Sequence, residues 1–252
     1  HFIFLKNSDG TITVSDYDNS NSNVAIPETI LDKTVSGIDS FAFSKNTTIT
    51  SVTMPNTVTK VGDSAFADAT NLLSAKLSEN CTDVGICLFQ GCTSLKSVDL
   101  NSKITLINAQ MFYKCSSIES IVIPDTVNKI GNYAFSECSS LKSVYIPSSV
   151  TEISRSAFRK TASVTIKGSY GSYAEEYAKA NNIPFEGISA YDVGDVNMDG
   201  GINILDATLV QKYVVGIVEL SAEQKHLADY NNDGDITVVD ATEIQKFIVH
   251  LN

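Results

Sequence analysis

The sequence predicts two modules: a solenoid whose coils stack into a parallel β-sheet, and a small all-α module built around two duplicated acidic loops. Three observations predict this fold class. Phenylalanine recurs at a constant spacing of 23 residues between positions 43 and 158. A segment rich in Asp and Asn occurs twice near the C-terminus, 34 residues apart. The density of negative charge rises sharply at the start of that acidic region.

The repeat is a 23-residue unit with a fixed apolar pattern. An aliphatic residue stands five positions before each phenylalanine, and a strand-like segment with alternating apolar positions follows it. A single unit cannot bury both rows, but stacked units can. We therefore expect six coils over residues 24–166, with a parallel sheet on one side. The repeated phenylalanines are Phe43, Phe66, Phe89, Phe112, Phe135 and Phe158.

Both ends of the solenoid carry predicted caps, because an open strand edge invites aggregation. Residues 1–23 contain two strand patterns joined by a turn-forming segment, which predicts a hairpin. Residues 167–185 contain Ser172 followed by Glu175, the spacing of a helix capping box. We expect a capping helix there, a linker over 186–191, and the acidic module over 192–252.

The outward side chains of the predicted strands form candidate ligand-binding positions. A serine row is flanked by variable residues, and such a face could bind a protein or a glycan. The alternative is that serine simply fits a crowded strand face. The absence of tryptophan weakens a sugar-binding role, although tyrosine is available. The variable positions are Thr53, Lys76, Asp99, Val122 and Tyr145.

The five cysteines predict no metal site, because neither a CxxC motif nor a nearby histidine accompanies them. Cys92, Cys115 and Cys138 share one repeat phase. Stacked coils give them parallel Cβ directions, which disfavours a disulfide, so we expect buried free thiols. Cys81 and Cys87 are the pair to examine for a bond.

The acidic region has the spacing of a calcium-binding loop in both copies. Oxygen-bearing side chains occupy positions 1, 3, 5, 9 and 12, position 7 offers its carbonyl, and glycine makes the sharp turn at position 6. We therefore expect two Ca²⁺ ions, with helices following over 207–215 and 241–249 and a short one over 221–228. The predicted ligands are Asp195, Asn197, Asp199, Gly201, Asn203 and Asp206 for one ion, and Asp229, Asn231, Asp233, Asp235, Thr237 and Asp240 for the other.

Charge and hydropathy narrow the range of partners. The 252 residues carry 18 Lys and Arg against 29 Asp and Glu, a net charge of −11. Residues 192–252 account for −8 of it and residues 1–191 for −3. This balance argues against nucleic acid and anionic lipid as partners. No apolar run is long enough to span a membrane, and the N-terminal residues lack a signal-peptide pattern, so we expect a trimmed, mature fragment.

One repeat shows the full pattern: Ile123-Pro-Asp-Thr-Val-Asn-Lys-Ile130, followed by Ala134-Phe135 and Leu141-Lys-Ser-Val144. This pattern, which covers roughly residues 24–166, closely resembles the leucine-rich repeats of bacterial surface antigens, called BspA-like. The resemblance implies an α/β-type leucine-rich-repeat solenoid that serves as a binding or display scaffold. The first coil departs from the pattern by an insertion between Pro27 and Ile38.

The duplicated loop-plus-helix resembles a type I-like dockerin, the calcium-folded module that binds a cohesin on a scaffoldin of the cellulosome. This resemblance implies a secreted, extracellular component of a polysaccharide-degrading complex. It also implies that loop positions 10 and 11 and two helix residues choose the partner. Apolar residues at positions 10 and 11 imply a cohesin with an apolar groove, unless they pack internally. The implied contacts are Ile204, Leu205, Gln211, Lys212, Val238, Val239, Gln245 and Lys246.

Catalysis is not expected from this chain. Its histidines are His1, His226 and His250, so the repeats lack the partners of a Ser-His-Asp or Cys-His site. The leading hypothesis is a non-catalytic component whose dockerin carries a leucine-rich-repeat binding module. The alternatives are a cell-surface adhesin, an inhibitor or organiser of a neighbouring enzyme, and an enzyme subunit whose catalytic domain lies outside this chain.

Overall fold

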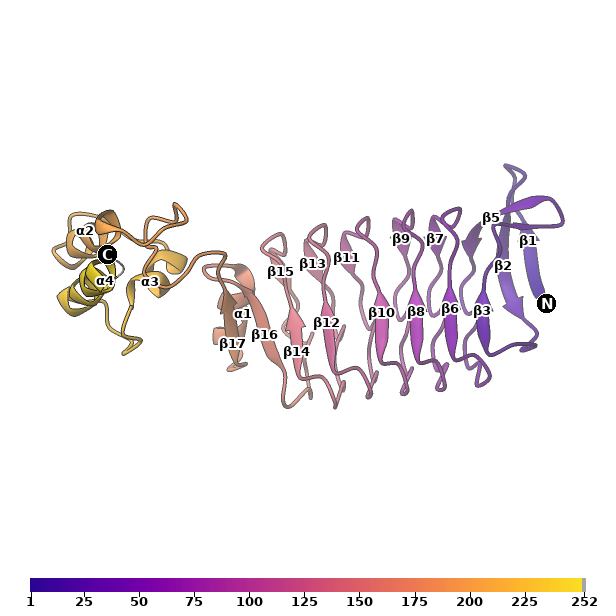
Figure 1. The fold of residues 1–252 in the computed structure, drawn as a ribbon. Helices are drawn as coiled ribbons and strands as arrows, with labels where there is room; N and C mark the ends of the chain where they lie inside the picture. Colours follow the sequence, from indigo (N-terminus) through magenta and orange to yellow (C-terminus); the bar gives the residue numbers. More distant parts are fainter. Residues whose placement is uncertain (251–252) are drawn as a thin grey trace.

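The structure, a computed structural model, describes residues 1–250. Residues 251 and 252, the last two of the predicted acidic module, lie outside the described residues. The chain forms an elongated rod of stacked coils with a small helical module at its C-terminal end (Figure 1). The rod has about eight coils, so turns from the two caps extend the 23-residue repeats.

Each repeat contributes two strands, which join two parallel ladders. The first ladder is the predicted sheet, and its strands pair in register, as Val52 pairs with Ala75. The second consists mainly of two-residue strands, which are too short to show an alternating pattern in the sequence. The first ladder contains β3 (Asn23–Ala25), β6 (Ser51–Thr53), β8 (Ser74–Lys76), β10 (Ser97–Asp99), β12 (Ser120–Val122), β14 (Ser143–Tyr145), β16 (Thr165–Ser169) and β17 (Phe185–Ile188). The second contains β5 (Lys33–Ile38), β7 (Lys60–Val61), β9 (Asp83–Val84), β11 (Leu106–Ile107), β13 (Lys129–Ile130) and β15 (Glu152–Ile153).

Both ladders are interrupted at the same level of the rod, between β9 and β11 and between β10 and β12. The turns bridge this interruption: Phe89 N donates to Met111 O at 2.9 Å, and Cys87 N donates to Ala109 O at 2.9 Å. Val98 in β10 is half-buried, whereas its counterpart Ile121 in β12 is buried. The rod therefore remains continuous through its turns and core where strand pairing stops.

A stack of phenylalanine rings runs along the core. The six repeated rings are buried, and successive centroids lie 5.0–5.8 Å apart with interplanar angles of 7–22°. Tyr17 lies 5.7 Å from Phe43 at one end, and Tyr177 lies 6.1 Å from Phe158 at the other. Offset aromatic stacking adds to the stabilisation that burial of these rings provides.

Cys92, Cys115 and Cys138, the cysteine row, fill a small space in the core and also form hydrogen bonds between coils. Each thiol donates to the carbonyl of the phenylalanine in the preceding coil, as Cys115 Sγ does to Phe89 O at 3.1 Å. Thr161 Oγ1 occupies the same phase and donates to Phe135 O at 2.6 Å. All five cysteines are free, as expected for the row. Cys81 and Cys87, the pair singled out for a possible disulfide, are not bonded.

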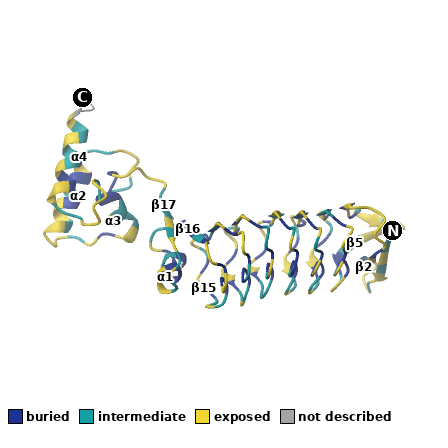
Figure 2. Cartoon of the chain, turned by 90° about the horizontal axis from the view of Figure 1, so that it is seen from below, coloured by how far each residue is buried: buried dark blue, intermediate teal, exposed yellow. Residues whose placement is uncertain are grey.

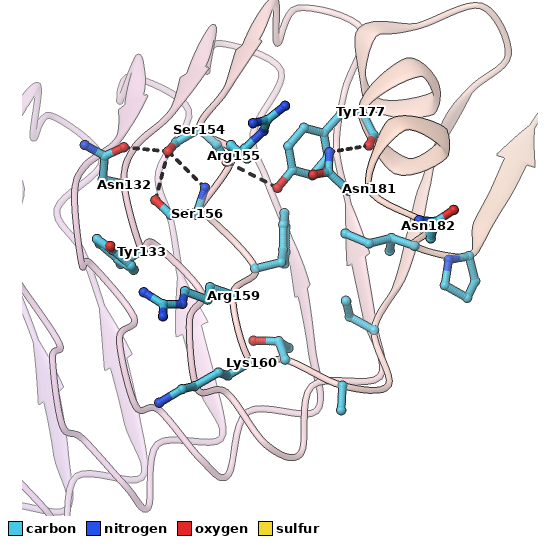
Figure 3. A pocket seen from close by; sticks show the side chains of 16 residues that line it. Asn132, Tyr133, Ser154, Arg155, Ser156, Arg159, Lys160, Tyr177, Asn181 and Asn182 are labelled. Carbon is cyan, nitrogen blue, oxygen red and sulfur yellow. Dashed lines mark hydrogen bonds between the residues drawn. The ribbon is translucent and has the colours of Figure 1, made fainter.

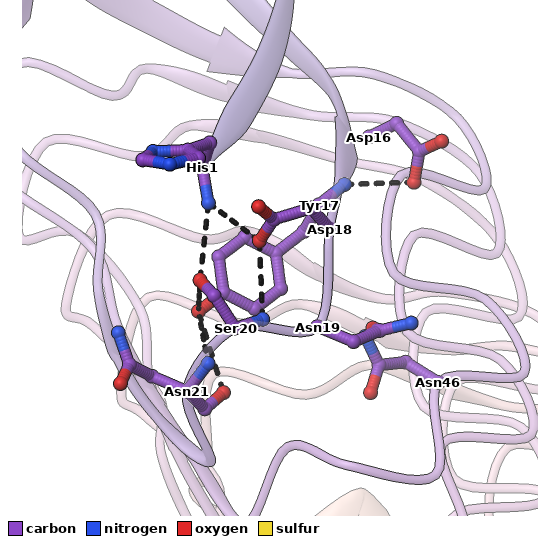
Figure 4. Close-up of polar contacts among 8 residues, drawn as sticks. All are labelled: His1, Asp16, Tyr17, Asp18, Asn19, Ser20, Asn21 and Asn46. Carbon is purple, nitrogen blue, oxygen red and sulfur yellow. Dashed lines mark hydrogen bonds and ion pairs between the residues drawn. The ribbon is translucent and has the colours of Figure 1, made fainter.

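The N-terminal cap is the expected hairpin, with β1 (Phe2–Lys6) antiparallel to β2 (Ile12–Tyr17). Strand β2 pairs with β5 and covers the edge of the second ladder. The insertion in the first coil forms β4 (Thr29–Ile30), which pairs with β5. A polar network closes the corner: Tyr17 Oη accepts from Asn21 N at 2.9 Å, and Asn46 Nδ2 donates to Asn19 Oδ1 (Figure 4).

The C-terminal cap contains helix α1 (Tyr173–Ala180), where Ser172 Oγ accepts from Glu175 N at 3.4 Å. The linker proposed for 186–191 needs correction, because β17 spans its first half and pairs in parallel with β16. The edge of β16 supplies backbone partners that the sequence pattern does not reveal. Only residues 189–191 connect the rod to the next module.

The C-terminal module consists of α2 (Ile204–Val214), α3 (Ala222–Ala228) and α4 (Val238–His250). Helices α2 and α4 pack together around a small core that includes Val210 and Ile244. Among the described residues, no helix combines the length and apolar character needed to cross a membrane.

We expect Phe112→Ala to lower the free energy of unfolding by about 3–5 kcal/mol, because it opens a cavity in the middle of the stack. Phe41→Ala is the control, since the Phe41 ring is 63% exposed, and it should change the free energy by less than about 0.5 kcal/mol. Guanidinium denaturation followed by circular dichroism measures both. Equal effects would contradict the stack as a main source of stability.

We expect iodoacetamide at mildly alkaline pH to alkylate Cys87 first, since this thiol is only half-buried. Burial raises the pKa of Cys92 and Cys138 to about 12 and that of Cys81 to about 11, so little reactive thiolate forms there. Mass spectrometry of native and unfolded protein identifies the labelled sites. Labelling of Cys92 in the native protein as fast as Cys87 would overturn this order.

Candidate functional site

The acidic module is organised by two twelve-residue loops, which we call loop I (residues 195–206) and loop II (residues 229–240). In loop I the Asp195 carboxylate accepts hydrogen bonds from the backbone N–H groups of Asp199 at 3.1 Å and Gly200 at 2.9 Å. Loop II repeats the pattern, with Asp229 accepting from Asp233 N at 3.1 Å and Gly234 N at 3.0 Å. The first predicted ligand therefore closes the same turn in both copies.

The glycine at position 6 is required by the backbone. Gly200 has φ = 93° and Gly234 has φ = 91°. Residues other than glycine adopt this backbone conformation only with strain. This conformation reverses the chain, so the residues at positions 1, 3 and 5 lie on the same side of the loop. In both copies the position 3 amide oxygen also accepts from the position 5 N–H at 2.9 Å.

The twelfth residue ties each loop to its helix. Asp206 is fully buried and accepts from Asn197 N at 2.9 Å and Asn203 N at 2.8 Å. Asp240, also fully buried, accepts from Asn231 N at 3.3 Å and Thr237 N at 2.8 Å. One carboxylate thus joins the start and the end of each loop.

The ninth residue has a structural role that the spacing does not reveal. Asn203 Oδ1 accepts from Leu205 N at 2.9 Å, and Thr237 Oγ1 accepts from Val239 N at 3.1 Å, so both residues cap helices. Helices α2 and α4 consequently begin at 204 and 238, three residues before the predicted starts at 207 and 241. Loop positions 10 to 12 form the first helical turn.

The electrostatics of the loops fit a hard divalent cation. The predicted donors are all oxygens, which Ca²⁺ prefers. No ion pair joins the buried carboxylates of Asp195, Asp206 and Asp240 to a Lys or Arg in the described part of the chain. Backbone N–H groups, and at Asp240 also the Thr237 hydroxyl, donate hydrogen bonds to them instead. Within residues 1–250, no group of three or more His, Cys, Asp or Glu side chains has metal-site spacing. Each predicted shell therefore mixes carboxylates with amide, hydroxyl or carbonyl oxygens.

The predicted partner-contacting residues lie at exposed positions on α2 and α4. Figure 2 shows exposed (yellow) segments on both helices. Ile204 and Leu205 are 56% and 60% exposed, and Val238 and Val239 are 57% and 50% exposed. They do not pack internally, which was the alternative. Gln211, Lys212 and Lys246 are exposed and Gln245 is half-buried. Lys246 Nζ lies 2.7 Å from Glu243 Oε1.

The sequence pattern missed part of the apolar surface. Val215 and Val249 occupy equivalent positions in the two copies, and 67% and 70% of their surface is exposed. Ile217 beside Val215 is exposed to a similar extent. Extending the helical spacing beyond Gln211 by four residues would have identified Val215.

The predicted ligand-binding row on the repeats lies in register along the first ladder. Thr53 pairs with Lys76, Lys76 with Asp99, and Val122 with Tyr145. The interruption between β10 and β12 divides this row, and a cleft of about 440 Å³ opens there between Asp99 and Val122. The Lys76 ammonium lies 3.5 Å from the Asp99 carboxylate. The row therefore forms two short patches.

The helical module contacts the rod through α3. The Tyr170 and His226 rings stack with centroids 4.2 Å apart, and Ser189 Oγ donates to Glu223 Oε1 at 2.8 Å. Gly187 is required below Tyr170, because a Cβ there would lie 2.1 Å from the ring. Helices α2 and α4 lie on the side away from the rod (Figure 1). The apolar surface is thus left open to a partner.

Comparison with solved structures shows similar solenoids. The T. pallidum leucine-rich-repeat protein TpLRR is 21% identical, with a TM-score of 0.58 over 75% of this chain and 97% of that chain. A leucine-rich cell surface protein from Faecalibacterium prausnitzii A2-165 is 25% identical, with a TM-score of 0.55 over 66% of this chain and 52% of that chain. No curated protein matches the chain. The first likeness shows the fold alone.

Family models divide the chain as its structure does. The model of the BspA type leucine-rich-repeat region matches in 6 copies over residues 13–115 and 68–173. The model of the dockerin type I domain matches residues 193–249, which include loops I and II. Both are non-catalytic binding modules. The chain belongs to the BspA-type leucine-rich-repeat family and carries a type I dockerin domain at its C-terminal end.

Proposed function

We propose that the chain is a non-catalytic component of an extracellular polysaccharide-degrading complex. Its dockerin folds around two Ca²⁺ ions, binds a cohesin on a scaffoldin and thereby attaches the leucine-rich-repeat module to the complex. The observation that carries this proposal is the duplicated loop geometry: each helix begins with an exposed apolar pair, and the buried twelfth-position carboxylate follows in the same turn. Dockerins bind cohesins as a class.

Calcium provides the positive charge that the loops lack. In loop I, the side chains of Asp195, Asn197, Asp199, Asn203 and Asp206 and the carbonyl of Gly201 would hold one ion. In loop II, the side chains of Asp229, Asn231, Asp233, Thr237 and Asp240 and the carbonyl of Asp235 would hold the other. Asp206 and Asp240 lie in the first turns of α2 and α4, so each ion would join the ligands of its loop to the start of the following helix. Calcium and folding are therefore coupled in this module.

The exposed aliphatic residues define the kind of cohesin that binds. Ile204 and Leu205 in one copy and Val238 and Val239 in the other would be desolvated in an apolar groove. Either copy could dock, which gives two poses related by a half turn. The α3 contact with the rod leaves both poses accessible, since it uses His226 and Glu223.

A cell-surface adhesin is the second candidate function. The supporting observation is the likeness of the repeats to the leucine-rich cell surface protein from Faecalibacterium prausnitzii. In this alternative the repeats bind a host or plant-wall surface, and the dockerin only anchors them. Cohesin binding is common to both candidates, so the ligand of the repeats distinguishes them.

Calcium titration tests the metal sites. We expect Asp206→Asn with Asp240→Asn to reduce calcium affinity at least a hundredfold and to lower the helical signal in circular dichroism, because each buried ligand loses its charge. Asp192→Asn removes an exposed carboxylate just outside loop I and should leave affinity unchanged. Calorimetry with wild type should give two ions per chain. Full affinity in the double variant would exclude these carboxylates as ligands.

Calorimetry with a panel of cohesins tests docking and its two poses. We expect tight binding of at least one cohesin with calcium and none with chelator. Ile204→Asp with Leu205→Asp, or Val238→Asp with Val239→Asp, should each weaken binding about twofold, and all four together should abolish it. Val122→Asp, an exposed valine on the repeats, is the control. Loss of binding from one pair alone would rule out the two poses, and failure of the quadruple variant to weaken binding would rule out this surface.

A further inference from the structure

A cleft that the sequence pattern did not predict lies between the last coil and the segment that follows α1. Its cavity has a volume of about 710 Å³, within the range of small-molecule sites. Arg155, Arg159 and Lys160 line it, and we call it the basic cleft (Figure 3). Asn181 and Asn182 form the opposite wall, together with the apolar side chains of the cap.

The charge of this cleft is opposite to that of the chain. Arg155 and Arg159 are the only two arginines in a sequence of net charge −11, and both line the same cavity. The 710 Å³ cavity has no carboxylate in its lining. Within residues 1–250, neither guanidinium forms an ion pair or a side-chain hydrogen bond, and both arginines are exposed. Two guanidinium groups therefore face solvent without a partner.

Elsewhere on the rod, several lysines are paired with a carboxylate of a neighbouring coil. Lys60 lies 2.9 Å from Asp83, and Lys129 lies 2.8 Å from Glu152. The two arginines have no such partner within residues 1–250. Arg155 and Arg159 occupy phases at which no earlier coil carries a cation. The two arginines are therefore not part of the ion pairing between coils.

A second cavity extends the cleft along the neighbouring coils. Its volume is about 300 Å³, and Tyr133, Arg159 and Lys160 line both cavities. Its carboxylate, Glu137, lies 3.0 Å from Lys160 and accepts a hydrogen bond from Tyr113 at 3.4 Å. In Figure 3 the Arg159 side chain extends towards Tyr133. The two cavities thus form a groove with two unpaired guanidinium groups and a half-exposed tyrosine ring.

We propose that the basic cleft binds an acidic oligosaccharide, a short chain of uronic acid residues. Guanidinium groups recognise carboxylates in bidentate fashion, and the two arginines would each take one carboxylate. Neutral amide and hydroxyl groups suited to sugar hydroxyls surround them: Asn132, Ser154, Ser156, Asn181 and Asn182. Tyr133 offers a ring face for the CH side of a sugar.

The polar lining favours a sugar over an acidic peptide. A peptide gains most of its affinity from a free strand edge or from apolar anchor pockets. Here the turn backbone is already bonded from coil to coil, as Phe135 N is to Ala157 O at 2.9 Å and Glu137 N to Arg159 O at 3.1 Å. The proposal goes beyond the docking function, since loops I and II lie in the other module.

Calorimetry with trigalacturonic acid on the full chain tests the proposal. We expect binding that weakens about ten- to a hundredfold in Arg155→Gln with Arg159→Gln, because each lost guanidinium group removes charge-assisted hydrogen bonds. Lys45→Gln removes an exposed cation from the first coil, at the repeat phase of Lys160, and should leave affinity unchanged. Melting temperature and cohesin binding should be the same in all variants, so a failure here is separable from a failure of docking.

Three results would overturn the proposal. The first is no binding of trigalacturonic acid to wild type, or binding that the double variant retains. The second is equal affinity for a neutral galactotriose, which would show that the carboxylates are not recognised. The third is tighter, arginine-dependent binding of a hexaglutamate peptide, which would assign the cleft to an acidic protein segment.

Discussion

Contact between successive coils is the constraint on which the rod depends. A 23-residue coil has no core of its own, and its phenylalanine is buried between the rings of the neighbouring coils and the aliphatic side chains of the core. The thiol and hydroxyl donors to the phenylalanine carbonyls hold the turns in the same register. At the two ends of the stack, the tyrosine rings of Tyr17 and Tyr177 contact the terminal phenylalanines and join the stack to the caps.

The C-terminal cap of the rod also determines where the dockerin lies. Strand β17 continues the first ladder, and the Tyr170 ring covers Gly187 in that strand before it meets His226 of α3. The short connection and these contacts place the dockerin at the end of the rod with α2 and α4 on its outer side (Figure 1). Docking would therefore project the repeats away from the scaffoldin. Two modules with different sources of stability share one junction.

Structural features that recur along the sequence could be predicted from their spacing. Features that occur once, or that depend on contacts between distant segments, could not. The phenylalanine phase, the free cysteine row and the duplicated loops each recur, so their spacing alone indicates their role. The two-residue strands were missed because they are too short to alternate, and β17 was missed because its pairing depends on the edge of β16. The basic cleft joins Tyr133, Arg159 and Asn182, which are distant in sequence and follow no period.

Differential scanning calorimetry of the full chain, with calcium and with chelator, tests the central claim that a rod held by stacking carries a module held by calcium. The account predicts two transitions. Chelation should remove or strongly lower the transition of the dockerin and leave that of the rod within about 2 °C, because the predicted ligands lie in loops I and II. A single transition, or an equal shift of both on chelation, would contradict it.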